Sequence, residues 1–253
     1  MLGADGRGFV AVTDQGRWLT GRLLLGSDGR LAGITDADIL PILMPDGSFV
    51  RATANMRDAE AVERLGDGSL IVAFEQNHRV WRYPTPTSPA EAYVGGADLA
   101  AQPDNGGIEA MAPLADGSLL LLSEEGRNAE GDHRGWLWRS GGLLPLSYAA
   151  EAGFAPTDIA RLADGDLLVL ERRFNPLTGF GARIVRLAGI AVVPGARLQG
   201  EEIARLEWPY LVENYEALAA APAADGGSYV YLASDDNFNI FQSTLLLQFR
   251  LAP

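Results

Sequence analysis

The sequence contains no cysteine and no lysine, so all 20 of its basic residues are arginines. The lack of cysteine excludes disulfides, thiolate nucleophiles and thiolate metal ligands. The lack of lysine excludes a Schiff base, a serine–lysine dyad and a phosphate-binding loop that depends on a lysine. The only histidines are His78 and His133, so histidine-based catalysis is limited to these two positions.

Positive charge is scarce as well, because 33 acidic residues against 20 arginines give a net charge of −13. Such a chain has no electrostatic attraction for nucleic acid, and we expect no nucleic-acid partner. No apolar run reaches the roughly 18 residues of a membrane-spanning helix, so we expect no membrane span. Residues 1–12 show no basic stretch followed by an apolar one, so no signal peptide is visible. The carboxylate excess favours divalent cations, cationic partners or simply solubility.

A hairpin signal repeats along the chain. Asp-Gly dipeptides lie between short apolar runs at intervals of 48 to 62 residues, and Asp-Gly in this setting is typical of a tight hairpin turn. Hairpins recurring at this interval predict the blades of a β-propeller. We count five units and expect an all-β, five-bladed propeller in one domain over residues 1–253, with six blades as the alternative. The dipeptides that define the units begin at Asp5, Asp67, Asp116, Asp164 and Asp225.

Further apolar runs supply the outer strands of each unit. A third strand follows the hairpin, for example over residues 79–84 and 135–140, and weaker fourth strands begin at Glu91, Leu143 and Ile190. The first unit keeps only its turn and second strand, and residues 26–55 are the least regular part of the chain. We therefore expect an incomplete N-terminal blade.

Acids flank the hairpins on both sides. Because the two strands of a hairpin are antiparallel, the acid before the first strand and the acid after the second should lie on the same rim of the propeller. If the first strand is innermost, these acids surround the mouth of a central channel. Oxygen ligands without histidine or cysteine favour Ca²⁺ or Mg²⁺. The predicted metal ligands are Glu60, Glu75, Glu109, Glu124, Glu216, Asp235, Asp236 and Asn237. The alternative is structural, since a carboxylate can also pair with the arginine that often begins the third strand.

The stretches "NGGIEAM", "LLVLERR" and "SDDNFN" resemble the phytase-like family, also called "esterase-like activity of phytase". The resemblance runs from about Arg57 to Leu251. It implies a propeller-like β fold in which aspartates and glutamates do hydrolytic, phosphoesterase-like work. Family members usually have an export signal and an inner strand before the first unit, which implies a periplasmic or secreted protein. This chain starts beyond that strand. The residues that match the family's motifs are Asp58, Glu60, Asn105, Glu109, Asp158, Glu171, Arg172, Arg183, Asn214, Glu216, Asp235, Asp236 and Asn237.

Three functions are compatible with these observations. The first is a monomeric, metal-dependent hydrolase of small phosphoesters, in which Arg172 and Arg183 grip phosphate oxygens. The second is a serine-type ester hydrolase, which has only Ser123 and Ser234 as rim hydroxyls and lacks a G-x-S-x-G motif. The third is a non-catalytic propeller that binds a ligand or partner and uses acid–arginine or calcium sites structurally. The catalytic residues predicted for the first function are Glu60, Glu109, Asp158, Glu171, Glu216, Arg172 and Arg183.

Overall fold

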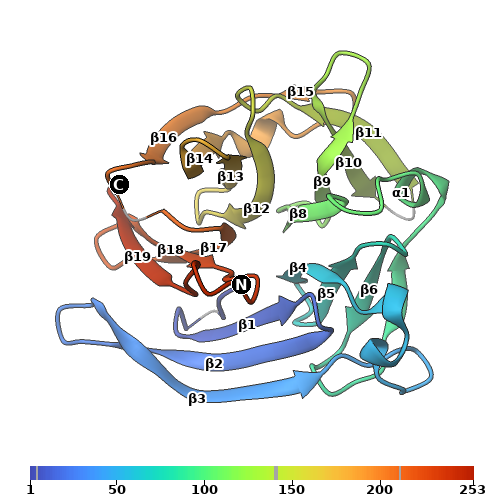
Figure 1. The fold of residues 1–253 in the computed structure, drawn as a ribbon, viewed down its shortest axis with the longest axis horizontal. Coiled ribbons are helices and arrows are strands. Elements are labelled where there is room, and N and C mark those ends of the chain that lie inside the picture. The colour runs from blue at the N-terminus through green and yellow to red at the C-terminus, as the bar shows by residue number, and fades with distance from the viewer. Residues whose placement is uncertain (4, 140–141, 211) are drawn as a thin grey trace.

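The computed structural model describes residues 1–3, 5–139, 142–210 and 212–253. Five small sheets stand side by side in a ring and form a five-bladed β-propeller (Figure 1). All strand pairs within the blades are antiparallel apart from one short outer pair. The all-β fold and the five blades predicted from the repeated hairpin are therefore confirmed.

The blades follow one another in chain order. The first contains β1 (Gly8–Thr13), β2 (Arg17–Leu25) and β3 (Leu31–Pro41), and the second contains β4 (Ala59–Arg64), β5 (Leu70–Phe74), β6 (Arg79–Tyr83) and β7 (Glu91–Val94). The third contains β8 (Ile108–Pro113), β9 (Leu119–Arg127), β10 (His133–Arg139) and β11 (Gly142–Tyr148), with β15 (Arg197–Leu198) parallel to β11. The fourth contains β12 (Ala155–Arg161), β13 (Leu167–Asn175), β14 (Gly179–Leu187) and β16 (Glu201–Leu206), and the fifth contains β17 (Tyr215–Pro222), β18 (Ser228–Ser234) and β19 (Leu246–Leu251). The short helical turns are η1 (Val50–Ala52), η2 (Ala54–Met56), α1 (Ala97–Ala100) and η3 (Gly189–Ala191).

The Asp-Gly turns share one further interaction. In every blade, the turn aspartate forms an ion pair with an arginine on the second strand that follows the turn. Because these pairs are largely exposed, each contributes at most about 1 kcal/mol. The pattern also shows which strand of the first blade corresponds to which strand elsewhere. Asp5 precedes β1 and its partner Arg22 lies on β2, so β1 is equivalent to the second strand of each other blade. The pairs are Asp5–Arg22, Asp67–Arg82, Asp116–Arg139, Asp164–Arg186 and Asp225–Arg250.

The first blade is incomplete among the described residues, as predicted. β1 stands at the inner edge of its sheet, where the second, third, fourth and fifth blades have β4, β8, β12 and β17 (Figure 1). The described residues 1–3 extend along that edge: Leu2 bridges to Phe9, the Met1 amino group donates to the Val10 carbonyl at 3.0 Å, and Gly3 N donates to Gly8 O at 2.7 Å.

One predicted strand is wrong. The segment that begins at Ile190 was expected to form a fourth strand, but it contains η3 and a turn, and β16 forms the fourth strand instead. The segment leaves its own blade, because Val192 is buried in the core shared with the third blade and Gly195 N donates to Pro145 O at 2.8 Å. Val192 therefore serves packing between blades rather than a sheet edge, whereas Ile190 and Val193 are exposed.

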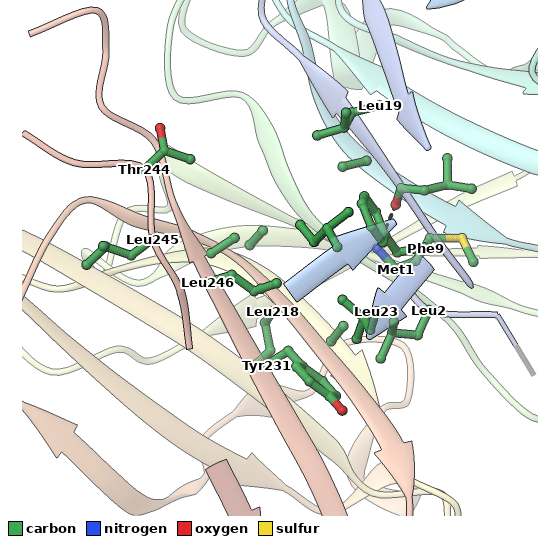
Figure 2. Close-up of a pocket in the computed structure, with 16 residues that line it drawn as sticks. Met1, Leu2, Phe9, Leu19, Leu23, Leu218, Tyr231, Thr244, Leu245 and Leu246 are labelled. Carbon is green, nitrogen blue, oxygen red and sulfur yellow. Dashed lines mark hydrogen bonds between the residues drawn. The ribbon is translucent and has the colours of Figure 1, made fainter. Parts of the chain in front are cut away.

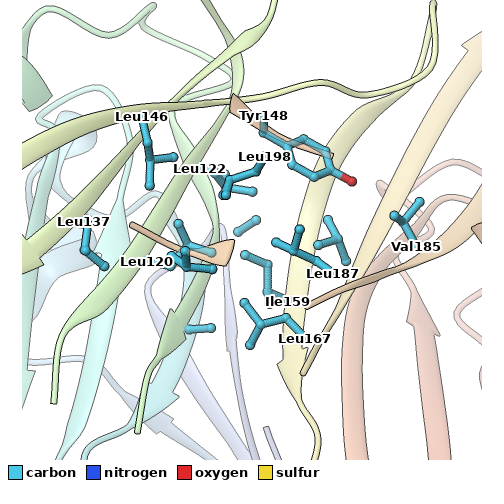
Figure 3. Close-up of a cluster of buried hydrophobic side chains, with 14 residues drawn as sticks. Leu120, Leu122, Leu137, Leu146, Tyr148, Ile159, Leu167, Val185, Leu187 and Leu198 are labelled. Carbon is cyan, nitrogen blue, oxygen red and sulfur yellow. The ribbon is translucent and has the colours of Figure 1, made fainter. Parts of the chain in front are cut away.

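The core lies between the blades. The largest cluster of buried apolar side chains joins the third and fourth blades, where Leu122 and Leu146 face Ile159 and Leu187 (Figure 3). The second strands are covered on both faces by neighbouring blades, so residues 70–74, 119–122 and 167–170 are buried without alternation. Their continuous apolar runs follow directly from this burial.

The ring closes where the first and fifth blades meet. Gln248 of β19 accepts a hydrogen bond from Leu31 N at 2.8 Å and donates to Gly29 O at 3.0 Å. Leu23 and Tyr231 pack together in a small buried cluster at the same seam. An apolar cavity of about 270 Å³ lies beside them, between β1 and β17 (Figure 2). The seam therefore combines hydrogen bonds and apolar contacts without a strand shared between blades.

We expect Tyr231→Ala to lower the free energy of unfolding by about 3 kcal/mol, because it removes a buried aromatic ring from a seam that already contains a cavity. Tyr231→Phe keeps the ring and loses only the hydrogen bond from Gln248 at 3.1 Å, so we expect a loss of about 1 kcal/mol. Urea unfolding of both variants measures the difference. Equal stabilities would contradict the role assigned to the ring.

Candidate functional site

Three inner strands present a glutamate at the same rim position. Each has a β-bulge there, at Glu60 of β4, Glu109 of β8 and Glu216 of β17. A bulge redirects a side chain that would otherwise follow the regular alternation of the strand. Burial raises the pKa of Glu60 and of Glu109 well above the ordinary value, and each pKa is raised further by carboxylates of other blades. The structure therefore brings these three predicted residues together at the mouth of the channel.

Asp158 does not occupy the equivalent place in β12. The bulged position there belongs to Thr157, because Asp158 lies six residues before its turn aspartate whereas Glu60 and Glu109 lie seven residues before theirs. A shift of one residue redirects a strand side chain. Asp158 instead accepts hydrogen bonds from Ile159 N at 2.8 Å and Leu218 N at 2.7 Å. The expectation that it lines the rim with the three glutamates is thus not met.

Asp58, Glu60 and Glu75 form a compact carboxylate cluster that can hold a metal ion. One oxygen of each lies within 4.8 Å of the others. Two of the three carboxylates accept hydrogen bonds from the surrounding chain. Gln76 donates to Asp58 Oδ2 at 2.7 Å, and Gly107 N donates to Glu75 Oε1. Burial raises the pKa of Glu75 to about 7, and the charge of Asp58 contributes to the increase. The hydrogen-bond donors around the cluster are uncharged, so full ionisation of the three carboxyls requires a compensating cation.

Gly107 is required by this arrangement. A Cβ atom at this position would lie 2.6 Å from the His78 ring and 3.3 Å from Glu75 Oε1. Only a glycine allows the backbone to approach closely enough for its N–H to reach the carboxylate. The Gly-Gly of "NGGIEAM" therefore positions a carboxylate from the neighbouring blade.

Arg172 of β13 lies among the acids of the two neighbouring blades. Its guanidinium contacts Glu124 at 2.7 Å, Glu216 at 2.5 Å and the side-chain oxygen of Asn214. Burial opposes the positive charge, but Glu124 and Glu216 more than compensate and raise the pKa of Arg172. Glu109 also shares a hydrogen bond with Glu124. Arg172 thus links the third, fourth and fifth blades across the mouth.

Glu171 and Arg183 are neighbours, as the hairpin geometry predicts. They are paired in register on β13 and β14, with Glu171 Oε2 2.9 Å from Arg183 Nε. Glu171 is fully buried and accepts a hydrogen bond from the Tyr148 hydroxyl, while Arg183 also pairs with Glu151 and Glu202. These contacts engage both residues in a network between the third and fourth blades, apart from the carboxylates of the mouth. Their predicted catalytic roles are not supported by any contact with the mouth.

The three residues after β18 differ in position. Burial is the main cause of the raised pKa of Glu216, and the negative charge of Asp235 raises it further. Asp236 accepts a hydrogen bond from Phe238 N at 2.9 Å, and Asn237 has a positive φ of 47° and donates to Gln242. Asp235 therefore borders the mouth, whereas Asp236 and Asn237 shape a turn.

Neither rim serine has the surroundings of a nucleophile. Ser123 Oγ donates to Gln102 Oε1 at 2.5 Å and accepts from Gly126 N, and Ser234 Oγ donates to Ser243 O at 2.7 Å. The buried His133 ring lies between two backbone carbonyls, at 3.1 and 3.2 Å. In the part of the chain that the structure describes, neither serine hydroxyl is hydrogen-bonded to a histidine ring, and His133 contacts Ser123 only through its backbone carbonyl. This geometry argues against the serine-hydrolase hypothesis.

Glu63 was missed by the sequence reasoning. It lies on β4, three residues beyond Glu60, and burial raises its pKa to about 8. The charge of Asp158 contributes to the raised pKa of Glu63, and burial raises the pKa of Asp158 to about 7. A second acidic layer therefore lies deeper in the channel. The available signal was a charged residue within an inner strand, where apolar residues are the rule.

The mouth has a large charge imbalance. Arg172 is the one arginine bonded to its acids in the described ranges. Several carboxyls at this distance cannot all ionise without compensation, so the mouth either retains protons or binds cations. The carboxyl groups are Asp58, Glu60, Glu75, Glu109, Glu124, Glu216 and Asp235.

The solved structures to which the chain is similar are distant from it. Virginiamycin B lyase from Staphylococcus aureus is 11% identical, with 98% of this chain and 86% of that chain covered and a TM-score of 0.45. A putative gluconolactonase is 15% identical, with 95% and 72% covered and a TM-score of 0.47. An endo-1,4-β-xylanase from Bacteroides thetaiotaomicron is 10% identical, with 97% and 94% covered and a TM-score of 0.48. At these values no function is transferred.

Sequence comparison is more specific. No curated protein matches the chain. Across the described residues, no helix has the length and apolar character needed to cross a membrane. Residues 2–238 match the phytase-like family, described as "esterase-like activity of phytase", which is nearly the whole chain. The chain therefore belongs to the phytase-like family.

Proposed function

We propose that the protein hydrolyses small phosphoesters at the channel mouth with the help of a divalent cation. The observation that carries the proposal is the charge imbalance there, in which Arg172 is bonded to a group of carboxyls that includes the compact Asp58–Glu60–Glu75 cluster. An anionic substrate would be repelled by these carboxyls unless bound cations reversed the local charge. Membership of the phytase-like family supports the same reaction class.

The donor set fits Ca²⁺ or Mg²⁺. Asp58, Glu60 and Glu75 offer only carboxylate oxygens, which these hard cations prefer. Gln76 and Gly107 already orient two of the three ligands, as second-shell donors do in metal sites. When bound, the cation supplies positive charge that polarises a phosphoryl oxygen. Asp235 borders the same mouth and would add a further oxygen ligand nearby.

The chain's own residues supply the remaining functions. Hydrolysis adds water to phosphorus, breaks the bond from phosphorus to the alcohol oxygen and requires a proton on the departing alcohol. Burial and the neighbouring charge of Glu124 raise the pKa of Glu109 and so favour its protonated form, which suits the role of proton donor. Arg172 presents a guanidinium that can bind phosphate oxygens in a bidentate manner. Glu124 and Asn214 hold that guanidinium in place.

The test is hydrolysis of p-nitrophenyl phosphate, bis(p-nitrophenyl) phosphate and p-nitrophenyl acetate by chelator-treated protein, with and without added Ca²⁺ or Mg²⁺. We expect cation-dependent turnover of a phosphoester, reduced on the order of 100-fold by Glu60→Gln or Glu75→Gln. Ser123→Ala and Ser234→Ala serve as matched controls that should retain turnover. Cation-independent cleavage of the acetate alone would support the serine-hydrolase alternative, and no turnover of any substrate would favour a binding propeller.

A further inference from the structure

Exposed aromatic side chains gather beside the mouth. Phe174, Trp208, Tyr210 and Phe241 are 63%, 86%, 67% and 88% exposed, respectively. They come from three connections on the rim face: the β13–β14 hairpin, the segment after β16 and the segment after β18. Apolar side chains concentrated on one part of a soluble surface usually mark a binding site. With Phe180, which packs on Phe174 at a ring separation of 4.9 Å, they are called the aromatic collar.

Two cavities connect the collar to the mouth. The larger, of about 530 Å³, is lined by Phe174 and Phe180 on one side and by Glu124 and Arg172 of the mouth on the other. The smaller, of about 240 Å³, lies between Phe180 and the remaining collar residues Trp208, Tyr210 and Phe241. Phe180 borders both cavities. A molecule placed at the mouth can therefore extend directly over aromatic surface.

Positive charge in the larger cavity is limited. Arg172 is bonded to Glu124 and Glu216, and Arg173 is paired with Glu207 at 2.6 Å. Arg127 also lines the cavity and forms no ion pair within the described part of the chain. Arg127 can bind the oxygens of one phosphate group, although the carboxylates of Glu124 and Glu125 lie near it. A compound with several phosphates would place further negative charge beside these acids with no other unpaired arginine lining the cavity among the described residues.

We propose that the substrate carries a single phosphate group esterified to an aromatic or similarly apolar alcohol. The phosphate binds between Arg127 and the mouth, and the apolar group lies in the larger cavity against Phe174 and Phe180. This inference rests on the proposed phosphoester hydrolysis for the position of the phosphate. The aromatic contact itself is a separate, measurable binding property. The proposal therefore makes the aromatic collar the region that determines substrate specificity.

The test uses non-hydrolysable phosphonates, so that binding is measured without turnover. We expect phenylphosphonate to bind the calcium-loaded protein about tenfold more tightly than methylphosphonate in calorimetry. Phe174→Ala should abolish most of this preference and leave methylphosphonate binding unchanged. Because Phe174 is largely exposed, the variant should fold normally. Phe249→Ala, which removes a partly exposed ring on β19 outside the collar, is the matched control.

Arg127→Gln should weaken both phosphonates by a similar factor, because it removes a contact to the shared phosphonate group. Equal affinities for the two phosphonates, a preference that survives Phe174→Ala, or no binding of either compound would overturn the inference. A phenyl preference lost in Phe174→Ala would support it even if no phosphoester were hydrolysed, and in that case only the proposed catalytic function would fail. Turnover of a phosphoester without a preference for phenylphosphonate would support the proposed catalytic function and contradict the aromatic specificity of the collar.

Discussion

Arg172→Met is expected to destabilise the protein by about 4 kcal/mol at pH 7.5 in the presence of a chelator. The substitution removes the guanidinium that contacts Glu124, Glu216 and Asn214. Loss of one partner from a buried ion pair leaves uncompensated charge in a poorly solvated site, and such losses typically cost about 3–5 kcal/mol. Urea unfolding of the variant and the parent protein measures the effect.

Two comparisons make this prediction specific. Arg139→Met removes an equally well-formed pair with Asp116, at 2.7 Å, but at an exposed turn, so we expect a loss below about 1 kcal/mol. Added Ca²⁺ should restore more stability to Arg172→Met than to the parent protein, because the variant mouth has one positive charge fewer. Similar losses for the two arginine variants would show that the Arg172 contacts do not carry the expected energy.

Stability in the presence of a chelator is expected to fall by about 3 kcal/mol between pH 6.5 and pH 8.5. Burial raises the pKa of Glu63 to about 8 and the pKa of Glu75 and Asp158 to about 7. A carboxyl with a raised pKa binds its proton more tightly in the folded state. Its contribution to stability is fully present below its unfolded-state pKa and is lost as the pH rises through its folded-state pKa.

The predicted interval starts at pH 6.5 because, below this pH, the two histidines increase the folding stability as the pH rises, which opposes the effect of the carboxyls. Burial lowers the pKa of His78 and His133, so their contribution increases as the pH rises towards the ordinary histidine value. Glu63→Gln should flatten the decline above pH 6.5, since glutamine cannot lose a proton. Saturating Ca²⁺ should also reduce the decline, because cation binding requires ionised carboxylates and strengthens as they deprotonate. A parent protein whose stability rises between pH 6.5 and pH 8.5 would refute the buried-carboxyl description.

The propeller could be predicted because its signals are local and repeated. Each Asp-Gly turn depends on a few neighbouring residues, and the five repeats favoured five blades over six, as the structure confirms. The segment at Ile190 was misassigned because Val192 packs in the core shared with another blade, a tertiary contact that no local pattern reports. Contacts of Gly107 with Glu75, and of Arg172 with Glu124 and Glu216, likewise join residues far apart in the sequence.

The site was predicted in part for a similar reason. Glu60, Glu109 and Glu216 were found because acids recur at hairpin entrances, and bulges place all three at the mouth. Asp158 was grouped with them because it is the acid nearest that position, but a one-residue difference in spacing gives the place to Thr157. Bulge positions depend on pairing between strands, and the register becomes visible only in the folded sheet.

Calcium titration followed by thermal unfolding tests the central claim, that the channel mouth holds a divalent cation. At about 100 times the dissociation constant, a cation that binds only the folded state adds about 2.7 kcal/mol, which corresponds to an increase in Tm of about 5 °C or more. Glu60→Gln should fold normally, because glutamine has nearly the size of the carboxyl and lacks the negative charge that burial disfavours at this position.

We predict a clear increase in Tm for the parent protein that Glu60→Gln and Glu75→Gln abolish and that Glu130→Gln, in an exposed loop, leaves intact. An unchanged Tm with Ca²⁺ or Mg²⁺, or an increase that all three variants retain, would contradict the account and leave the mouth as a protonated, arginine-linked carboxyl cluster.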